Sequence, residues 1–251
     1  MRRIITILIF FSFQTVGRES GQTEITTDDG IEVFNQEKYY LLKTNVKIIS
    51  DEYELSADLV KAYFNKDLYD ITRIFSDGNV TLISSKGIKA SGEKIDFDII
   101  NEDLQIFGKN SLFTNKEIIM ISDEEIKINN ITGNFLIKGP DSRLKSDTID
   151  ITGYLIKGKF SQIENINEVE LLYVEDEKQI NIKTETLDMY ALSANYDKKI
   201  NIIELFDNVK IIRDNESILG DYAKINTLTE SYKVTSKESG KVKALLDKKD
   251  E

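Results

Sequence analysis

Carboxylates are the side chains of this sequence that could do chemistry, because it contains neither His nor Cys. The usual general base, the thiol nucleophile and the common zinc ligands are therefore excluded. Carboxylates could still pair across a groove for glycoside hydrolysis, or bind Ca²⁺. Four acids stand out because each follows a small residue: Ala57-Asp58, Gly92-Glu93, Ser146-Asp147 and Gly220-Asp221. The closest two, Asp58 and Glu93, are 35 residues apart and do not cluster as a calcium loop requires. We expect neither an enzyme, a metal site nor a cofactor.

These acids belong to a cassette that returns along the chain. An Asn opens a short apolar run thirteen or fourteen residues before each acid, at Asn45, Asn79, Asn134 and Asn208. The second and fourth residues after each acid are apolar, and this period of two is typical of a strand with one buried face. The pattern predicts a stack of similar β units. The small residue is expected at a bend, where the acid bonds a nearby backbone amide.

Turn residues separate the apolar runs, and helical spacing is seldom sustained. The turn signals are Asp28–Gly30, Ser76–Gly78, Ser84–Gly87, Gly139–Ser142 and Asp214–Glu216. Residues 164–175 leave a short helix open beside a strand, since Ser161 and Glu164 have capping-box spacing. We expect an all-β, repeat-like fold of roughly 16–22 short antiparallel strands, about 5–6 residues each.

The N-terminus has the pattern of an export signal. Arg2 and Arg3 precede an apolar stretch from Ile4 to Phe13, which is too short to span a membrane. We expect residues 1–17 to be a cleaved signal peptide, with an uncleaved anchor as the alternative. Residues 18–246 are expected to form one elongated β domain and residues 247–251 a charged tail. The net charge of −11 argues against nucleic-acid binding.

The order and spacing of several short motifs resemble a known family. The motifs are "GNV" at 78–80, "TNV" at 44–46, "GNF" at 133–135 and "DNV" at 207–209, with "SADLVKAYF" at 56–64 and "LGDYAKI" at 219–225. The leading "TEITTDDG" (23–30) and the final "TSKESGKVKALL" (235–246) fit the same pattern. They resemble the LptA/OstA-like family of periplasmic lipopolysaccharide-transport proteins, which carry an organic solvent tolerance-like domain. The similarity is good over 23–106 and 202–246 and loose over 107–201.

The resemblance implies a twisted, open β-jellyroll in the periplasm whose apolar groove holds the acyl chains of lipopolysaccharide. It also implies end-to-end stacking with copies of itself and with homologous jellyrolls of inner- and outer-membrane partners. We expect the docking edges at Thr23–Thr27 and Lys241–Leu246. The expected groove lining is Ile25, Leu42, Val46, Ile48, Leu55, Val60, Val80, Leu82, Ile95, Phe97, Val209, Ile211 and Ile225. Plain core packing is the alternative for each of these residues.

Two other functions stay open. One is an inner-membrane-anchored acceptor of lipopolysaccharide, of the LptC type. The other is a structural β filament with a packed interior and no ligand.

Overall fold

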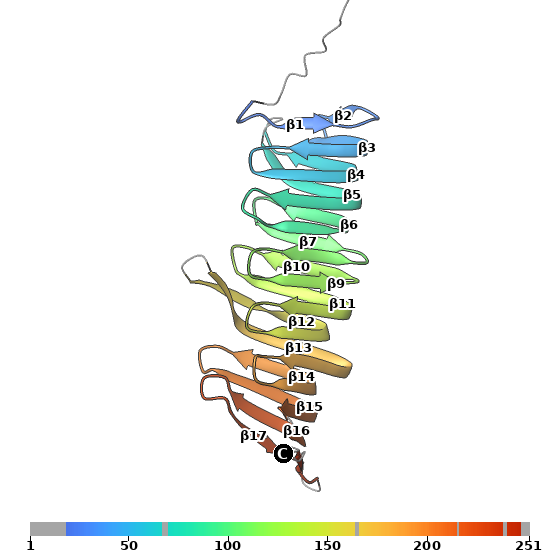
Figure 1. The fold of residues 1–251 in the computed structure, drawn as a ribbon. Helices are drawn as coiled ribbons and strands as arrows, with labels where there is room; N and C mark the ends of the chain where they lie inside the picture. Colours follow the sequence, from blue (N-terminus) through green and yellow to red (C-terminus); the bar gives the residue numbers. More distant parts are fainter. Residues whose placement is uncertain (1–18, 67–69, 164–165, 215, 238–239, 247–251) are drawn as a thin grey trace, which may run out of the picture.

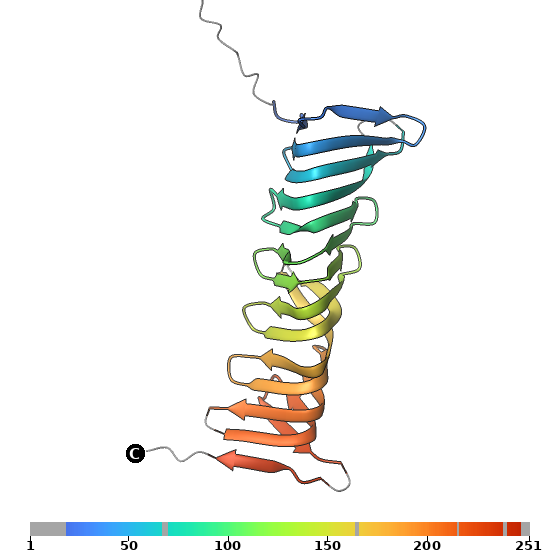
Figure 2. The same ribbon diagram turned by 90° about the vertical axis from the view of Figure 1, so that its right-hand side faces the viewer.

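Strands are the only regular elements in the described part of the chain, and all eighteen belong to one antiparallel sheet. The computed structural model describes residues 19–66, 70–163, 166–214, 216–237 and 240–246. The strands stack along one long axis into an elongated, twisted molecule (Figures 1 and 2). The prediction of an all-β, jellyroll-like fold is confirmed. The signal peptide expected at 1–17 and the charged tail expected at 247–251 lie outside the described residues.

The strands follow one another without interruption along the chain. Their bounds are β1 Glu24–Thr26, β2 Ile31–Phe34, β3 Tyr39–Ile49, β4 Tyr53–Phe64, β5 Ile71–Ser84, β6 Lys89–Asp98, β7 Asp103–Phe107, β8 Ser111–Thr114, β9 Ile119–Ser122, β10 Glu125–Asn129, β11 Asn134–Lys145, β12 Asp150–Ile163, β13 Ile166–Lys183, β14 Asp188–Asp197, β15 Ile202–Arg213, β16 Glu216–Asn226, β17 Ser231–Thr235 and β18 Lys243–Leu246. Residues 166–175 belong to β13, so the helix left open there does not form.

Most strands are longer than the 5–6 residues expected, because each continues around a bend. The register with the neighbouring strand shifts midway, for example between Lys43 and Val46 and between Phe206 and Val209. A left-handed residue sits at many of these shifts, including Asn45, Asn79 and Asn208. Three of the four cassette asparagines therefore mark bends.

The bends divide the sheet into two walls that face each other. Wall A is the half that ends in β2 and β17, and wall B is the half that ends in β1 and β18. Hairpin turns close the free edges. Rim A, on wall A, has described turns at 35–38, 99–102, 130–133, 198–201 and 227–230. Rim B, on wall B, has described turns at 50–52, 85–88, 115–118, 146–149 and 184–187. At about 4.8 Å per strand the stack is roughly 60 Å long.

Three sequence expectations about turns are wrong. Residues 76–78 and 139–142 lie inside β5 and β11, where they bend the strand and do not separate two strands. Asn134 opens the apolar strand β11, as the cassette predicts, and the left-handed residue there is Gly133 of the preceding turn. Ser146 and Asp147 lie in a rim B turn and not at a bend. The hairpin at Ser84–Gly87 is confirmed, since Gly87 N–H bonds the Ser84 carbonyl.

Small residues and acids hold the other bends as expected. A Cβ on Gly220 would lie 2.5 Å from Val234 Cγ1, and one on Gly92 would lie 2.7 Å from Ile106 Cγ2. The neighbouring acids accept backbone hydrogen bonds, Glu93 from Lys109 N–H at 3.2 Å and Asp221 from Lys237 N–H at 2.8 Å. The cassette therefore encodes the bend between the walls.

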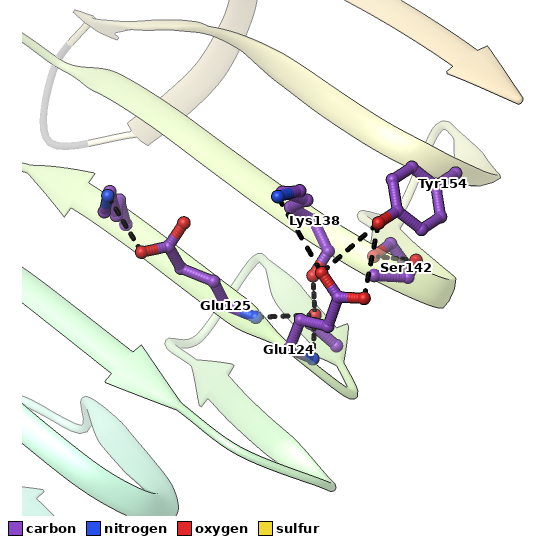
Figure 3. Close-up of polar contacts among 8 residues, drawn as sticks. Glu124, Glu125, Lys138, Ser142 and Tyr154 are labelled. Atoms are coloured by element: carbon purple, nitrogen blue, oxygen red, sulfur yellow. Dashed lines mark hydrogen bonds and ion pairs between the residues drawn. The ribbon is translucent and has the colours of Figure 1, made fainter.

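Polar side chains fasten the bend between β10, β11 and β12 (Figure 3). Ser142 Oγ donates to the Gly139 carbonyl at 2.8 Å, and Tyr154 Oη donates to Glu124 at 3.3 Å. Lys138 Nζ lies 3.9 Å from the Glu124 carboxylate. Glu124, Lys138 and Tyr154 thus form an exposed polar group at this bend, whereas Ser142 is fully buried and its hydroxyl is satisfied by the Gly139 carbonyl.

Candidate functional site

The space between the walls is filled by one apolar cluster that runs along the stack. Its members come from almost every strand between β3 and β16, because alternate residues of both walls point inward. Ladder partners show this alternation: Leu42 pairs with Val60, and Met189 pairs with Ile211. The inner face is therefore continuous from the first long strand to the last.

The predicted lining residues all lie on this inner face. Ten of them are buried in the cluster: Leu42, Val46, Ile48, Leu55, Val60, Val80, Ile95, Val209, Ile211 and Ile225. Leu82 and Phe97 are half-buried and pack against it. Ile25 is exposed, because its strand β1 is the last of wall B. Contact of these residues with a lipid stays a prediction.

The lining predicted from the sequence omits the residues in the middle of the cluster. It includes Ile106, Ile137, Leu144, Ile151, Ile156, Val174, Ile180 and Met189, all fully buried. The same alternation marks them, for example in Ile149 and Ile151 after Asp147. The irregular cassette spacing over 107–201 obscured the signal.

A cleft of about 780 Å³ opens between the two rims over the C-terminal half of the stack. Its floor is apolar and comes from both walls, with Leu144 and Met189 of wall B and Ile203 and Ile225 of wall A. The turns 146–149 and 184–187 form its rim B lip. Its rim A lip is formed by Glu168, Val169, Tyr196, Lys198, Asn226, Thr227 and Glu230. The interior is thus accessible from the side at this place.

The lips of the cleft are charged and largely paired. Lys198 forms an ion pair with Glu168 on rim A, and Glu230 of rim A pairs at 3.2 Å with Arg213 of wall B. On rim B, the Arg143 guanidinium hydrogen-bonds Asp150 and lowers the pKa of that carboxyl. Burial raises the pKa of Tyr196, whose ring lines the cleft. This arrangement suits an apolar ligand that enters between polar lips.

A second, shallower depression of about 600 Å³ lies on the outer face of wall A. Leu136, Leu171 and Ile202 line it, together with Tyr173, whose ring lies under Lys157 Nζ at 4.7 Å. Gly158 lies in its floor and leaves the Phe135 ring close to the surface.

Among the described ranges, no three His, Cys, Asp or Glu side chains gather closely enough to hold a metal ion. In those ranges there is also no apolar helix of the length that crossing a membrane requires.

Comparisons with known proteins relate the C-terminal half to one family. Residues 120–231 match the family model described as "LptA/(LptD N-terminal domain) LPS transport protein". Among solved structures, the chain is similar to LptH of Pseudomonas aeruginosa, described as the LptA homologous periplasmic component of the lipopolysaccharide transport device. The identity is 14%, the TM-score is 0.44, and the match covers 52% of this chain and 95% of LptH. No curated protein matches. Residues 120–231, less than half of the chain, are therefore similar to this family.

Proposed function

We propose that this chain is a non-enzymatic carrier that shields the acyl chains of lipopolysaccharide between its two walls during transport from the inner to the outer membrane. The continuous apolar interior, open to the side at the cleft, is the observation that carries the proposal. The family match of residues 120–231 supports the choice of lipopolysaccharide and of the periplasm.

The physical need for such a carrier follows from hydration. Each methylene exposed to water costs about 0.8 kcal/mol, so a chain of about fourteen carbons costs on the order of 10 kcal/mol. An apolar space between two walls removes this cost without any bond chemistry. The 44 acids of the chain outnumber its 33 Lys and Arg, and this net negative charge disfavours lipid phosphates, so recognition rests on the acyl chains and the headgroup stays outside.

Photo-crosslinking tests the proposal. A photoreactive residue is placed at Ile48, Phe97 or Ile211, which point inward, and at the outward-pointing neighbours Lys47, Asp98 and Lys210 as controls. The inward set should capture lipopolysaccharide and the outward set should not. Thermal unfolding followed by circular dichroism checks that each variant is folded. Equal capture by both sets would contradict an interior site.

End-to-end association is the second part of the proposal. The terminal strands expose inward-pointing apolar side chains, Ile25, Ile31 and Val33 at one end and Leu246 at the other. Each end also leaves a row of backbone donors and acceptors unpaired by a further strand within the described chain. Other copies, or homologous jellyrolls of membrane partners, would cover both.

The direction of the terminal strands supports head-to-tail stacking. Inside the chain, β7 and β8 form one layer that pairs antiparallel with the layer of β10 and β9. β17 and β18 run as β7 and β8 do, first towards the bend and then away from it, and β1 and β2 run as β9 and β10 do. A copy that places β18 beside β1 and β17 beside β2 therefore repeats the internal junction.

A ligand-free β filament is the competing function, favoured by the burial of the central lining residues. Native mass spectrometry of the purified protein separates the two, since a carrier retains lipid and a filament does not. N-terminal sequencing of the exported protein separates a free carrier from an anchored acceptor, which keeps Met1 to Phe13.

A further inference from the structure

One rim of the molecule presents aliphatic side chains to solvent at its hairpin tips. Ile100, Ile131, Ile200 and Leu228 are 66%, 64%, 59% and 76% exposed. Each lies in a four-residue turn of rim A that ends in a left-handed residue. We call these four residues the rim row. The polar turn at 35–38 lies beyond its N-terminal end.

The turns that carry the rim row are neighbours in the stack. Asn130 N–H donates to the Glu102 carbonyl at 3.0 Å, which joins the turn of Ile131 to that of Ile100. Thr227 N–H donates to the Asn201 carbonyl at 2.9 Å, which joins the turn of Leu228 to that of Ile200. The hairpin of β12 and β13 extends between the two pairs (Figure 1). Members of one pair are about 10 Å apart, two strand spacings.

Rim B provides an internal comparison, because its turns close the same walls. Its exposed tip residues in the described chain are polar or glycine, including Asp51, Lys86, Lys116, Asp147 and Glu185. Its apolar turn residues point inward instead: Ile118 and Leu187 belong to the core cluster, and Ile88 and Ile149 pack against it. Hairpin tips in this fold therefore do not require an exposed aliphatic residue.

The position of the rim row relates it to the cleft. The turns of Ile200 and Leu228 contribute Lys198, Thr227 and Glu230 to the rim A lip. Ile200 itself lines the depression on the outer face of wall A, so its turn lies between that depression and the cleft. Single aliphatic side chains on a line, each flanked by polar residues such as Asn130 and Lys199, do not make the contiguous patch of about 800 Å² that a stable protein interface buries on each partner. A narrow, flexible hydrocarbon chain fits such a line.

We infer that the rim row is the lip over which acyl chains load sideways into the cleft, and that rim B does not take part in loading. The inference rests on the proposed function and adds the path by which the lipid reaches the interior. The rim row gives an incoming acyl chain brief apolar contacts along rim A before that acyl chain enters between the walls. It should therefore govern the rate of loading more than the amount bound.

The test uses the variant Ile100→Thr/Ile131→Thr/Ile200→Thr/Leu228→Thr. The matched control is Ile83→Thr/Ile119→Thr/Ile121→Thr, which removes exposed aliphatic side chains from the outer face of wall B. Stopped-flow fluorescence with cis-parinaric acid gives the association rate, and titration gives the amount bound at saturation. The rim row variant should load more slowly by about threefold or more, with unchanged saturation, while the control keeps the parent rate.

The outcomes separate this inference from the proposed function. Equal rates for parent and rim row variant, with normal saturation, overturn the inference and leave the carrier intact. Failure of the parent to bind the probe overturns both. If the rim row variant keeps its loading rate but no longer co-sediments with phosphatidylethanolamine–phosphatidylglycerol vesicles that the parent binds, the row docks on a bilayer and the inference is wrong.

Discussion

At some positions neighbouring strands approach so closely that only a glycine fits. Gly158 in β12 is the tightest example. A Cβ at this position would lie 2.2 Å from the Leu171 carbonyl oxygen and 2.7 Å from Phe135 Cζ. This backbone oxygen cannot move away easily, because Leu171 belongs to β13, which pairs with β12. Such glycines let β11, β12 and β13 pack where Phe135 stacks on Phe160 at 4.4 Å.

Gly158→Ala should therefore destabilise the fold by about 1–3 kcal/mol, the range for inserting a methyl group into a filled site. Urea unfolding followed by circular dichroism measures the change. Lys157→Ala, at the exposed neighbouring position, should stay within about 0.5 kcal/mol of the parent. An unchanged unfolding midpoint for Gly158→Ala would contradict the close approach.

The pair of Arg143 and Asp150 should make stability depend on acid pH. Hydrogen bonding by Arg143 lowers the pKa of Asp150 in the folded chain. The contribution is fully present above the unfolded pKa of about 4 and is lost as the pH falls through the lower folded value. Asp150→Asn should cost about 0.5–1 kcal/mol at pH 7, and less as the pH falls below 4. Unfolding measured from pH 7 to pH 3 tests this, with Asp147→Asn as the control that keeps the parent profile.

Bends within strands, more than turns between them, give this fold its two walls. Asn208 has a φ of 54°, in a region that glycine and asparagine adopt readily and β-branched residues adopt only at a steric cost, as Thr44 does with a φ of 64°. The register between β15 and β16 shifts beside it, between Phe206 and Val209. The geometry of the bend therefore depends on the residue type at this position.

Asn208→Val should destabilise the protein by about 1–2 kcal/mol, because valine pays the steric cost of the left-handed conformation. Asn208→Gly meets the same backbone requirement and should be nearly neutral. Thermal unfolding of the two variants gives the comparison. Equal losses for valine and glycine would mean that the amide side chain, and not the backbone angle, matters at this bend.

The sequence predicted the strands better than their connections. Alternation placed Val46, Val80 and Val209 on the inner face, since burial of one face needs only a period of two. It could not tell a bend from a hairpin at Ser76–Gly78, because both use glycine or asparagine in the left-handed region. For the same reason the sequence predicted a bend at Ser146-Asp147, where the structure has a hairpin turn.

Features that depend on stacking were beyond local patterns. The cleft brings together Leu144 and Ile225, which are far apart in the chain and meet only because the walls face each other. The rim row is equally hidden, since Ile131 and Leu228 read as ordinary apolar residues until their turns are aligned along one edge. The whole molecule therefore determines which apolar residues meet solvent.

The two ends of the stack differ, and this difference predicts how copies assemble head to tail. Two variants test it by placing lysine at inward-pointing positions. The variant Ile25→Lys/Val33→Lys blocks one end, and the variant Ala244→Lys/Leu246→Lys blocks the other. Each variant alone should be monomeric, because its remaining end finds only blocked partners. An equimolar mixture should form one-to-one heterodimers and nothing longer, since one junction of β18 beside β1 and β17 beside β2 stays intact. Sedimentation velocity and native mass spectrometry distinguish these species.

The matched control places lysine on the outward faces of the same strands, in Thr26→Lys/Leu245→Lys, where the stacked interior is not touched. This variant should assemble like the parent, because the ladder hydrogen bonds at a strand edge do not depend on outward side chains. Homodimers of either inward-blocked variant would indicate a head-to-head or tail-to-tail contact. A mixture that stays monomeric would show that these strand edges do not mediate assembly, and the copies would then have to meet through another surface.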